Sequence, residues 1–167
     1  GGVVEALEAR RGGNPITTST GFESLDERWR GLNPGQLIVV AGRPAMGKTT
    51  LAMNIAEHVA RKKRVLFFSL EMGRDELIEK MISSVGEVFY RDIRDSTFWN
   101  NAQQSAKFES AMPRLAKLDL AIDDTGTITM PQIRARARRH GEAGLIVIDY
   151  LQLITKERGV STYDHVT

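Results

Sequence analysis

The sequence contains no cysteine, no apolar run long enough to cross a lipid bilayer and no large excess of charge of one sign. Without cysteine, disulfide bonds and thiolate metal sites are excluded. The N-terminus lacks the positively charged and then apolar pattern of a signal peptide. A net charge of +2 is too small to indicate nucleic-acid binding by itself. We therefore expect a cytosolic protein rather than a disulfide-rich secreted domain or a membrane protein.

The composition is that of an ordinary globular protein. Hydrophobic residues make up 41% of the 167 residues and charged residues 26%, which predicts a single domain with a substantial core. Positive charge is concentrated at residues 61–64 and 134–140. The arginines of the second stretch are by default a solvated helix face, and contacts with phosphate or with another subunit are the alternative.

A glycine-rich stretch at residues 42–50 matches the pattern G-x-x-x-x-G-K-[ST]. Its two glycines let successive backbone N–H groups point at phosphate oxygens. Lys48 is expected to reach the β- and γ-phosphates of a nucleotide, and the Thr49 hydroxyl to bind Mg²⁺. The predicted nucleotide-binding residues are Gly42, Arg43, Pro44, Ala45, Met46, Gly47, Lys48, Thr49 and Thr50.

The flanks of this stretch favour a phosphate loop over a plain glycine-rich turn. The apolar run at residues 37–41 predicts a strand before the loop, and the apolar spacing of residues 50–60 predicts a helix after it. Such a helix offers its positive N-terminal end to an anion. We therefore expect the chain to bind a nucleoside triphosphate.

Three further apolar runs predict strands, at residues 65–70, 118–123 and 145–149, and the continuous run of the first suits a strand buried on both faces. Helices are predicted at residues 24–29, 74–83, 108–117 and 129–140. Pro113 must start or kink an element, whereas Thr129 and Pro131 predict a helix N-terminus. The alternation of strands and helices favours parallel strands with right-handed crossovers, so the predicted fold is a three-layer α/β sandwich.

Acidic residues at the carboxyl ends of these strands are the candidates for chemistry. Asp149 is expected to organise Mg²⁺ beside the phosphate loop, and a surface aspartate is the alternative. Glu71 is expected to act as the base that orients or deprotonates an attacking water. A simple negative charge at the start of the next helix is the alternative for Glu71. Asp123 also ends a strand and competes with Glu71 for the role of base.

The first residues predict a short helix followed by a loop. Val3, Val4 and Leu7 lie on one helical face, and residues 12–15 end that helix. Two interpretations stay open, a frayed terminus and a linker helix that docks its apolar face on another subunit.

Several segments resemble the DnaB-type replicative helicases, in the same order along the chain. The first are residues 19–26, the phosphate loop at 41–50 and Phe-Ser-Leu-Glu-Met at 68–72. The others are residues 122–124, residues 133–139 and Ile-Asp-Tyr-Leu-Gln-Leu at 148–153. The Ser-Leu-Glu-Met and Ile-Asp-Tyr-Leu-Gln-Leu segments separate this family from RecA, RadA and KaiC-like ATPases, which share the earlier motifs. The resemblance spans residues 18–154.

This resemblance implies a RecA-like motor domain with a mostly parallel sheet that is incomplete at its C-terminal side. Residues 1–15 would hold a linker helix and loop, and residues 16–167 the N-terminal part of the ATPase domain. The implied activity is that of a homo-hexameric ring that uses ATP and Mg²⁺ to move on single-stranded DNA and unwind duplex DNA. Glu71 would be the catalytic base, and Lys156 and Arg158 would contact DNA. Implied partners are a primase and a helicase loader, in the cytoplasm, for a bacterial or phage-encoded protein.

In the family, the polar sensor and the arginine finger lie beyond Asp149, and the chain ends at Thr167. An arginine finger contributes several orders of magnitude to turnover in related hydrolases. The 167-residue chain alone is therefore expected to bind Mg·ATP but to hydrolyse it poorly. A sheet without its later strands is also expected to expose an edge.

Other ATPases remain as rival interpretations. One is a RecA or RadA-type recombination ATPase, which helicase activity on a forked duplex would distinguish. Another is a KaiC-like nucleotide-dependent switch, for which DNA would not stimulate ATP hydrolysis. A small-molecule kinase is disfavoured because no arginine-rich lid follows the second strand.

Overall fold

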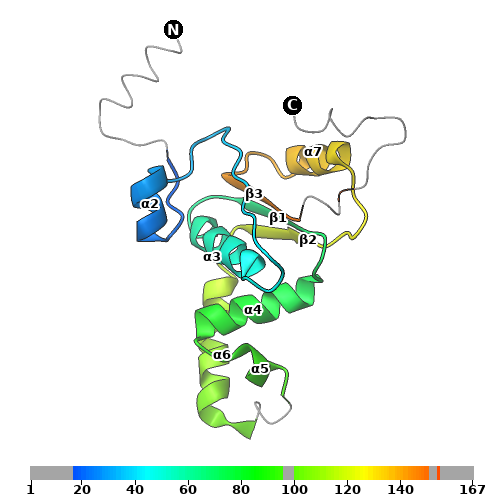
Figure 1. The fold of residues 1–167 in the computed structure, drawn as a ribbon. Helices are drawn as coiled ribbons and strands as arrows, with labels where there is room; N and C mark the ends of the chain where they lie inside the picture. The colour runs from blue at the N-terminus through cyan, green and yellow to red at the C-terminus, as the bar shows by residue number, and fades with distance from the viewer. Residues whose placement is uncertain (1–16, 96–99, 151–153, 155–167) are drawn as a thin grey trace.

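A three-stranded parallel sheet forms the centre of the fold (Figure 1). The computed structural model describes residues 17–95, 100–150 and 154. In chain order its elements are α2 (Glu23–Trp29), α3 (Lys48–Ala60), β1 (Val65–Ser69), α4 (Arg74–Gly86), α5 (Tyr90–Ile93), α6 (Ala102–Leu115), β2 (Leu120–Asp123), α7 (Met130–Arg139) and β3 (Leu145–Asp149). The strand order is β2-β1-β3, so β1 is central. The predicted α/β class and the parallel sheet are confirmed.

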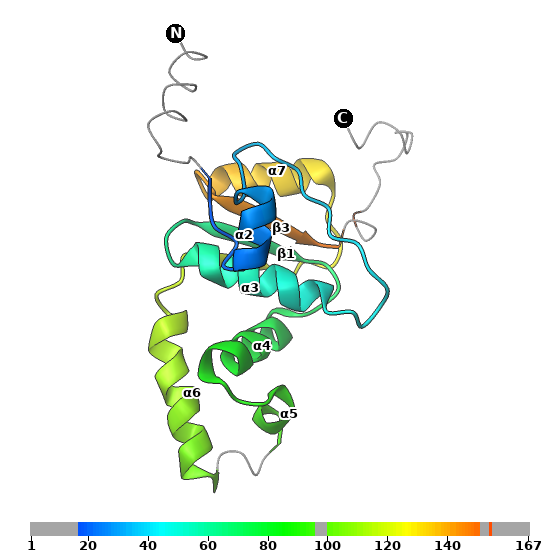
Figure 2. The same ribbon diagram turned by 60° about the vertical axis from the view of Figure 1, so that its left-hand side comes forward.

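Alternate residues of β1 pack against opposite faces of the sheet. Val65 and Phe67 join the core formed with α3 and α4, whereas Leu66 and Phe68 pack with Ile133 of α7. Every residue of β1 is buried, as its continuous apolar run predicts. Helices α3 and α4 therefore cover one face of the sheet and α7 the other, an arrangement that Figure 2 shows from a second side. The predicted three layers are confirmed.

The start of α7 follows the sequence prediction. The backbone N–H of Thr129 donates to Oε1 of Gln132 at 2.8 Å, and Pro131 lies in the first turn of the helix. Gly141 follows the helix with φ +81°, a backbone conformation that glycine adopts without strain. The predicted helix at residues 129–140 is confirmed.

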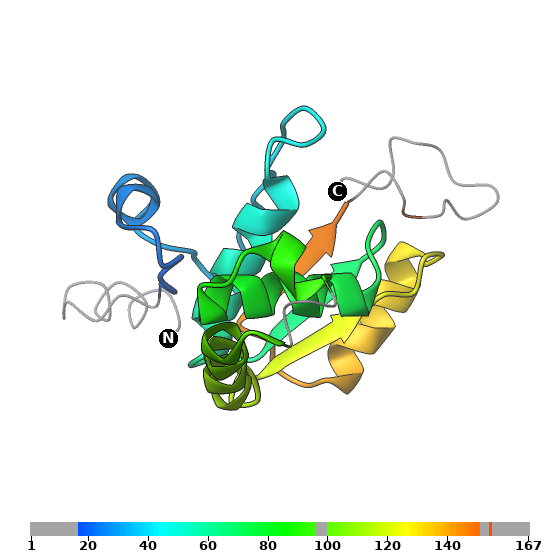
Figure 3. The same ribbon diagram turned by 90° about the horizontal axis from the view of Figure 1, so that it is seen from below.

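Helix α6 differs from the prediction at its beginning. It begins well before residue 108, because the side chain of Asn101 accepts hydrogen bonds from the N–H groups of Gln103 and Gln104. Pro113 lies inside this helix near its end and starts no element. Figure 3 shows α6 and α5 from below the sheet. No helix in the described part of the chain is both long and apolar enough to span a membrane.

Residues 37–41 do not form the predicted strand. Within the described part of the chain the segment pairs with no strand, and the side chains of Leu37 and Val39 are 76% and 66% exposed. It lines an open cleft whose opposite wall includes β3. A strand needs a hydrogen-bonded neighbour, and within the described part of the chain β3 pairs with β1 and not with this segment. The strand prediction was wrong here because periodicity reports apolar character and not the presence of a partner.

Candidate nucleotide-binding site

The two residues predicted to hold Mg²⁺ meet at the carboxyl end of β3. The Thr49 hydroxyl Oγ1 donates to Oδ2 of Asp149 at 2.6 Å, although 100 residues separate them in the chain. Thr49 lies in the first turn of α3, and Asp149 is the last residue of β3 and buried. A hydroxyl and a carboxylate oxygen are the hard donors that Mg²⁺ prefers. The pair therefore fits a Mg²⁺ ion that takes its remaining ligands from phosphates and water.

Residues 42–48 form the loop that leads into α3. The ammonium Nζ of Lys48 donates to the carbonyl oxygens of Gly42 at 3.1 Å and Arg43 at 3.2 Å, which folds the lysine over the loop. Gly47 has φ +82° and precedes the helix. Among the described residues no side chain caps this helix end, so the first-turn N–H groups are available to an anion. The loop therefore brings backbone N–H groups and an ammonium group, the donors that bind phosphate in such loops, to the start of α3.

Glu71 lies in the short loop between β1 and α4. This loop lines the same open cleft as Lys48, Thr49 and Asp149. The N–H of Leu70 donates to the backbone oxygen of Asp149 at 2.7 Å, which joins the loop to the end of β3. The Glu71 side chain is exposed to solvent. The structure thus brings the candidate base and the candidate phosphate-binding and metal-binding residues to one edge of the sheet.

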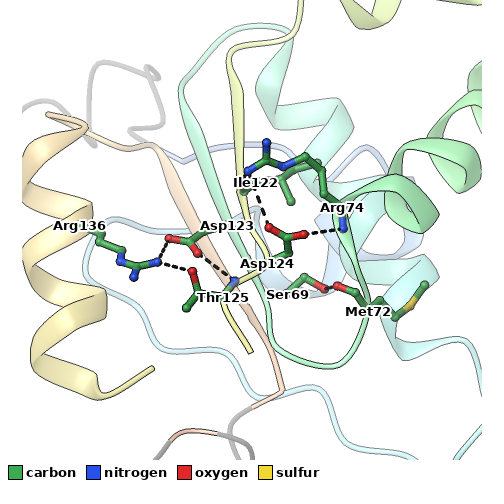
Figure 4. Close-up of polar contacts among 8 residues, drawn as sticks. All are labelled: Ser69, Met72, Arg74, Ile122, Asp123, Asp124, Thr125 and Arg136. Carbon is green, nitrogen blue, oxygen red and sulfur yellow. Dashed lines mark hydrogen bonds and ion pairs between the residues drawn. The ribbon is translucent and has the colours of Figure 1, made fainter. Parts of the chain in front are cut away.

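Asp123, the rival candidate for the base, lies in a different environment. Its carboxylate accepts hydrogen bonds from the guanidinium of Arg136 and from the N–H of Thr125 at 3.1 Å (Figure 4). Burial raises the pKa of Asp123, but these hydrogen bonds outweigh it and lower the pKa below its ordinary value. Asp123 lines a separate hollow beside α7 and not the cleft of Lys48. The Asp123 carboxylate is thus already hydrogen-bonded within the fold and lies away from the cleft, which favours Glu71 as the base.

The arginines of α7 are not all part of a solvated face. Arg134, Arg138 and Arg139 are exposed, as the default interpretation predicts, but Arg136 points back to the turn after β2. Its Nη1 also donates to Oγ1 of Thr125 at 2.8 Å. The spacing of the arginines gave no sign of which one would turn inward.

The Ser-Thr-Gly segment has a structural role that sequence reasoning did not assign. Asp26 of α2 accepts hydrogen bonds from the N–H and the hydroxyl of Thr20, both at 2.8 Å, and from the Ser19 hydroxyl at 2.7 Å. Burial raises the pKa of Asp26, but these bonds lower it to below its ordinary value. A Cβ on Gly21 would lie 2.7 Å from Cγ of His58 in α3. The segment therefore binds α2 through Asp26, and its backbone at Gly21 passes close to α3.

Two sets of predictions fall outside the described residues. The N-terminal helix and loop at residues 1–15 belong to the first set, and the DNA contacts Lys156 and Arg158 to the second.

One protein family matches the whole described region in sequence. The family described as "DnaB-like helicase C terminal domain" matches residues 17–166. The replicative DNA helicase DnaB of Pasteurella multocida (strain Pm70) is 43% identical over 159 residues, which are 90% of this chain and 34% of that protein. This chain therefore spans about a third of the length of the curated relatives that it matches.

Two solved structures are similar to the chain in three dimensions. A DnaB-like replicative helicase, reported with its interactions with primase, has a TM-score of 0.82 and 25% identity, over 95% of this chain and 40% of that one. The second solved structure is an ATPase domain, with a TM-score of 0.85 and 25% identity, over 95% of this chain and 59% of that one.

Proposed function

Because the chain belongs to the DnaB-like helicase C-terminal domain family and has its RecA-like fold, we propose that it binds Mg·ATP as part of a replicative DNA helicase. The longer protein would couple ATP hydrolysis to movement on single-stranded DNA as a homo-hexamer. A primase is the proposed partner, since a similar helicase was solved with its interactions with primase. A helicase loader is the second proposed partner, and the cytoplasm the proposed location.

The contact between Thr49 and Asp149 carries this proposal. It joins the helix after the phosphate loop to the end of β3 through two oxygen groups at 2.6 Å. Within the described part of the chain, no group of three or more His, Cys, Asp and Glu side chains could hold a metal by itself. Mg²⁺ is commonly bound by one or two protein oxygens together with substrate phosphates, and this pair suits that manner of binding.

Each residue of the site then has a proposed part in the reaction. The N–H groups of residues 42–50 and the Lys48 ammonium bind and orient the phosphates of ATP. Thr49 and Asp149 would hold Mg²⁺, which neutralises developing negative charge on the transferred phosphoryl group. Glu71 accepts the proton of the attacking water or orients it. Lys48 must leave the carbonyl oxygens of Gly42 and Arg43 to reach a phosphate.

The proposal is tested by measuring ATP hydrolysis of the full-length protein with and without single-stranded DNA. We expect DNA to stimulate hydrolysis, and Lys48→Ala to reduce it by at least about 100-fold, the usual loss when a preorganised charge contact is removed. Turnover that is indifferent to DNA would point instead to a switch-type ATPase.

Lys62→Ala is the matched control for Lys48→Ala. Lys62 follows α3 at its other end and is exposed, so its removal changes the charge of the protein equally without touching the cleft. Hydrolysis by Lys62→Ala should equal that of the wild type. Equal losses in the two variants would show an effect of net charge rather than of phosphate binding.

A further inference from the structure

The loop that carries Glu71 is fixed at its beginning by two hydrogen bonds. The N–H of Leu70 donates to the backbone oxygen of Asp149 at 2.7 Å, and the buried Ser69 hydroxyl donates to the backbone oxygen of Met72 at 2.6 Å. These bonds hold the residues on either side of Glu71. Neither bond reaches the end of the loop, where α4 begins.

Asp124 supplies that anchor from the turn after β2. Its Oδ2 accepts a hydrogen bond from the backbone N–H of Arg74 at 3.0 Å, and its Oδ1 lies 3.7 Å from Nη2 of the same arginine (Figure 4). Arg74 is the first residue of α4, and its N-cap, Gly73, has no side chain that could accept a hydrogen bond. A carboxylate from another element thus takes the place of the missing cap, where negative charge also stabilises the helix N-terminus.

The turn that presents Asp124 is itself held by α7. Arg136 donates to the carboxylate of Asp123 and to the hydroxyl of Thr125, the two neighbours of Asp124 in the chain. Arg74 adds a hydrogen bond from Nη2 to the backbone oxygen of Ile122 at 3.1 Å. Contacts therefore run without a break from α7, through the end of β2, to the start of α4.

We infer that Asp124 is a positioning residue for Glu71, because its carboxylate fixes the N-terminus of α4 and so the end of the loop that carries the proposed base. The inference rests on the proposed role of Glu71. Asp124 lines the hollow beside α7 and not the cleft of Lys48, so it acts on the reaction only through the loop. A displacement of about 1 Å at a reacting group can lower a rate by about 100-fold.

Two substitutions remove the hydrogen bond from opposite sides. Asp124→Ala removes the acceptor. Arg74→Pro removes the donor, and proline suits the first position of a helix. Gly73 already has φ −68° and ψ 156°, the conformation that a residue before proline favours. Each variant should lower kcat for ATP hydrolysis by the full-length protein about 10- to 100-fold and leave KM for ATP unchanged.

Two conservative variants separate positioning from a general loss of structure. Asp124→Asn keeps an oxygen that can accept the N–H of Arg74, and Arg74→Ala keeps the N–H, so both should retain most of the wild-type kcat. Asp119→Ala is a further control, because it removes an exposed carboxylate that pairs with Arg64 at the opposite end of β2. It should hydrolyse ATP as the wild type does.

Combination with Glu71→Gln shows whether Asp124 acts through Glu71. In that background, Asp124→Ala and Arg74→Pro should cause no further loss of kcat, since the group that they position is already absent. An equal loss in both backgrounds would overturn the inference, as would unchanged kcat in Arg74→Pro. If Asp124→Ala did not fold, Arg74→Pro and Arg74→Ala would decide the question by the same comparison.

The same measurements keep this inference apart from the proposed function. Full turnover by Glu71→Gln would overturn both the assignment of the base and the positioning role. Loss of turnover in Glu71→Gln together with wild-type kcat in Asp124→Ala would overturn the positioning role alone.

Discussion

The phosphate loop and the loop of Glu71 line the same cleft, but different contacts hold them. Residues 42–48 are bound mostly to themselves, through Lys48 on the oxygens of Gly42 and Arg43. Residues 70–74 are bound to other elements, through Asp149 of β3 at one end and Asp124 after β2 at the other. The conformation of the phosphate loop thus depends on its own residues, whereas that of the Glu71 loop depends on residues distant in the chain.

This difference separates the expected effects of substitution. Changes in the phosphate loop should act on nucleotide binding, since its backbone and lysine are the proposed contacts of ATP. Changes at the anchors of the second loop should act on turnover, because they move Glu71 without touching the nucleotide. Asp149 belongs to both, since its carboxylate contacts Thr49 and its backbone oxygen accepts from Leu70.

The largest expected effect, and the strictest test of this separation, is that of Glu71→Gln. The amide cannot accept a proton from water, so kcat for ATP hydrolysis by the full-length protein should fall by about 10²- to 10⁴-fold. The affinity for ATP should not change. Glu109→Gln, at an exposed position on α6, is the matched control. Weakened ATP binding in Glu71→Gln would show that the two loops are not separable.

Asp149→Asn tests the point at which the two loops meet. The substitution removes a charged oxygen next to Thr49 but keeps the backbone oxygen that binds Leu70. The Mg²⁺ concentration for half-maximal hydrolysis should rise at least about 10-fold, since even the loss of an outer-shell partner costs about 10- to 100-fold in metal affinity. Asp119→Asn should leave this concentration unchanged. An unaltered Mg²⁺ dependence in Asp149→Asn would contradict the proposed metal site.

The same difference explains which parts of the site the sequence could predict. The phosphate loop was recognisable because its residues are contiguous and its glycines have a stereochemical reason. Asp149 and Glu71 were predictable because each follows an apolar run, and the ends of parallel strands meet at one edge. The anchor between Asp124 and Arg74 was not predictable, since 50 residues separate the two and no local pattern records the contact.

The elements of the fold also differ in how far the sequence alone could predict them. Strands β1 and β3 carry their own signal in continuous apolar runs, and α7 carries its capping residues. Residues 37–41 carry an equally strong apolar signal but lie unpaired in the described part of the chain. Whether an apolar run becomes a strand depends on a neighbour with free hydrogen-bonding groups, which is a property of the whole sheet and not of the run.

Arg136→Ala tests the contact that holds the turn after β2, from which Asp124 reaches the Glu71 loop. It leaves the partly buried Asp123 without its guanidinium, which should lower the free energy of unfolding by about 1.5 kcal/mol at pH 7. The hydrogen bonds keep the pKa of Asp123 below its ordinary value despite burial, so they stabilise the fold above about pH 4 and cease to do so as the pH falls through the lowered pKa.

The stability difference between wild type and Arg136→Ala should therefore shrink below about pH 4. Urea denaturation at several pH values measures it, with Arg138→Ala, at an exposed position of the same helix, as the control. A difference that stayed constant with pH would show that Arg136 stabilises the fold by packing and not through the Asp123 carboxylate.

The smallest expected effect comes from one glycine in each loop. A Cβ would meet no atom within 4 Å at Gly47 or at Gly73, so sterics cannot distinguish them. Gly47 has φ +82° and Gly73 φ −68°. Gly47→Ala should thus lower the free energy of unfolding by about 1 kcal/mol, whereas Gly73→Ala should raise it by about 0.5 kcal/mol through the unfolded state. Equal values in urea denaturation would mean that the phosphate loop can relax to a negative φ, and that its curl is not fixed by its own sequence.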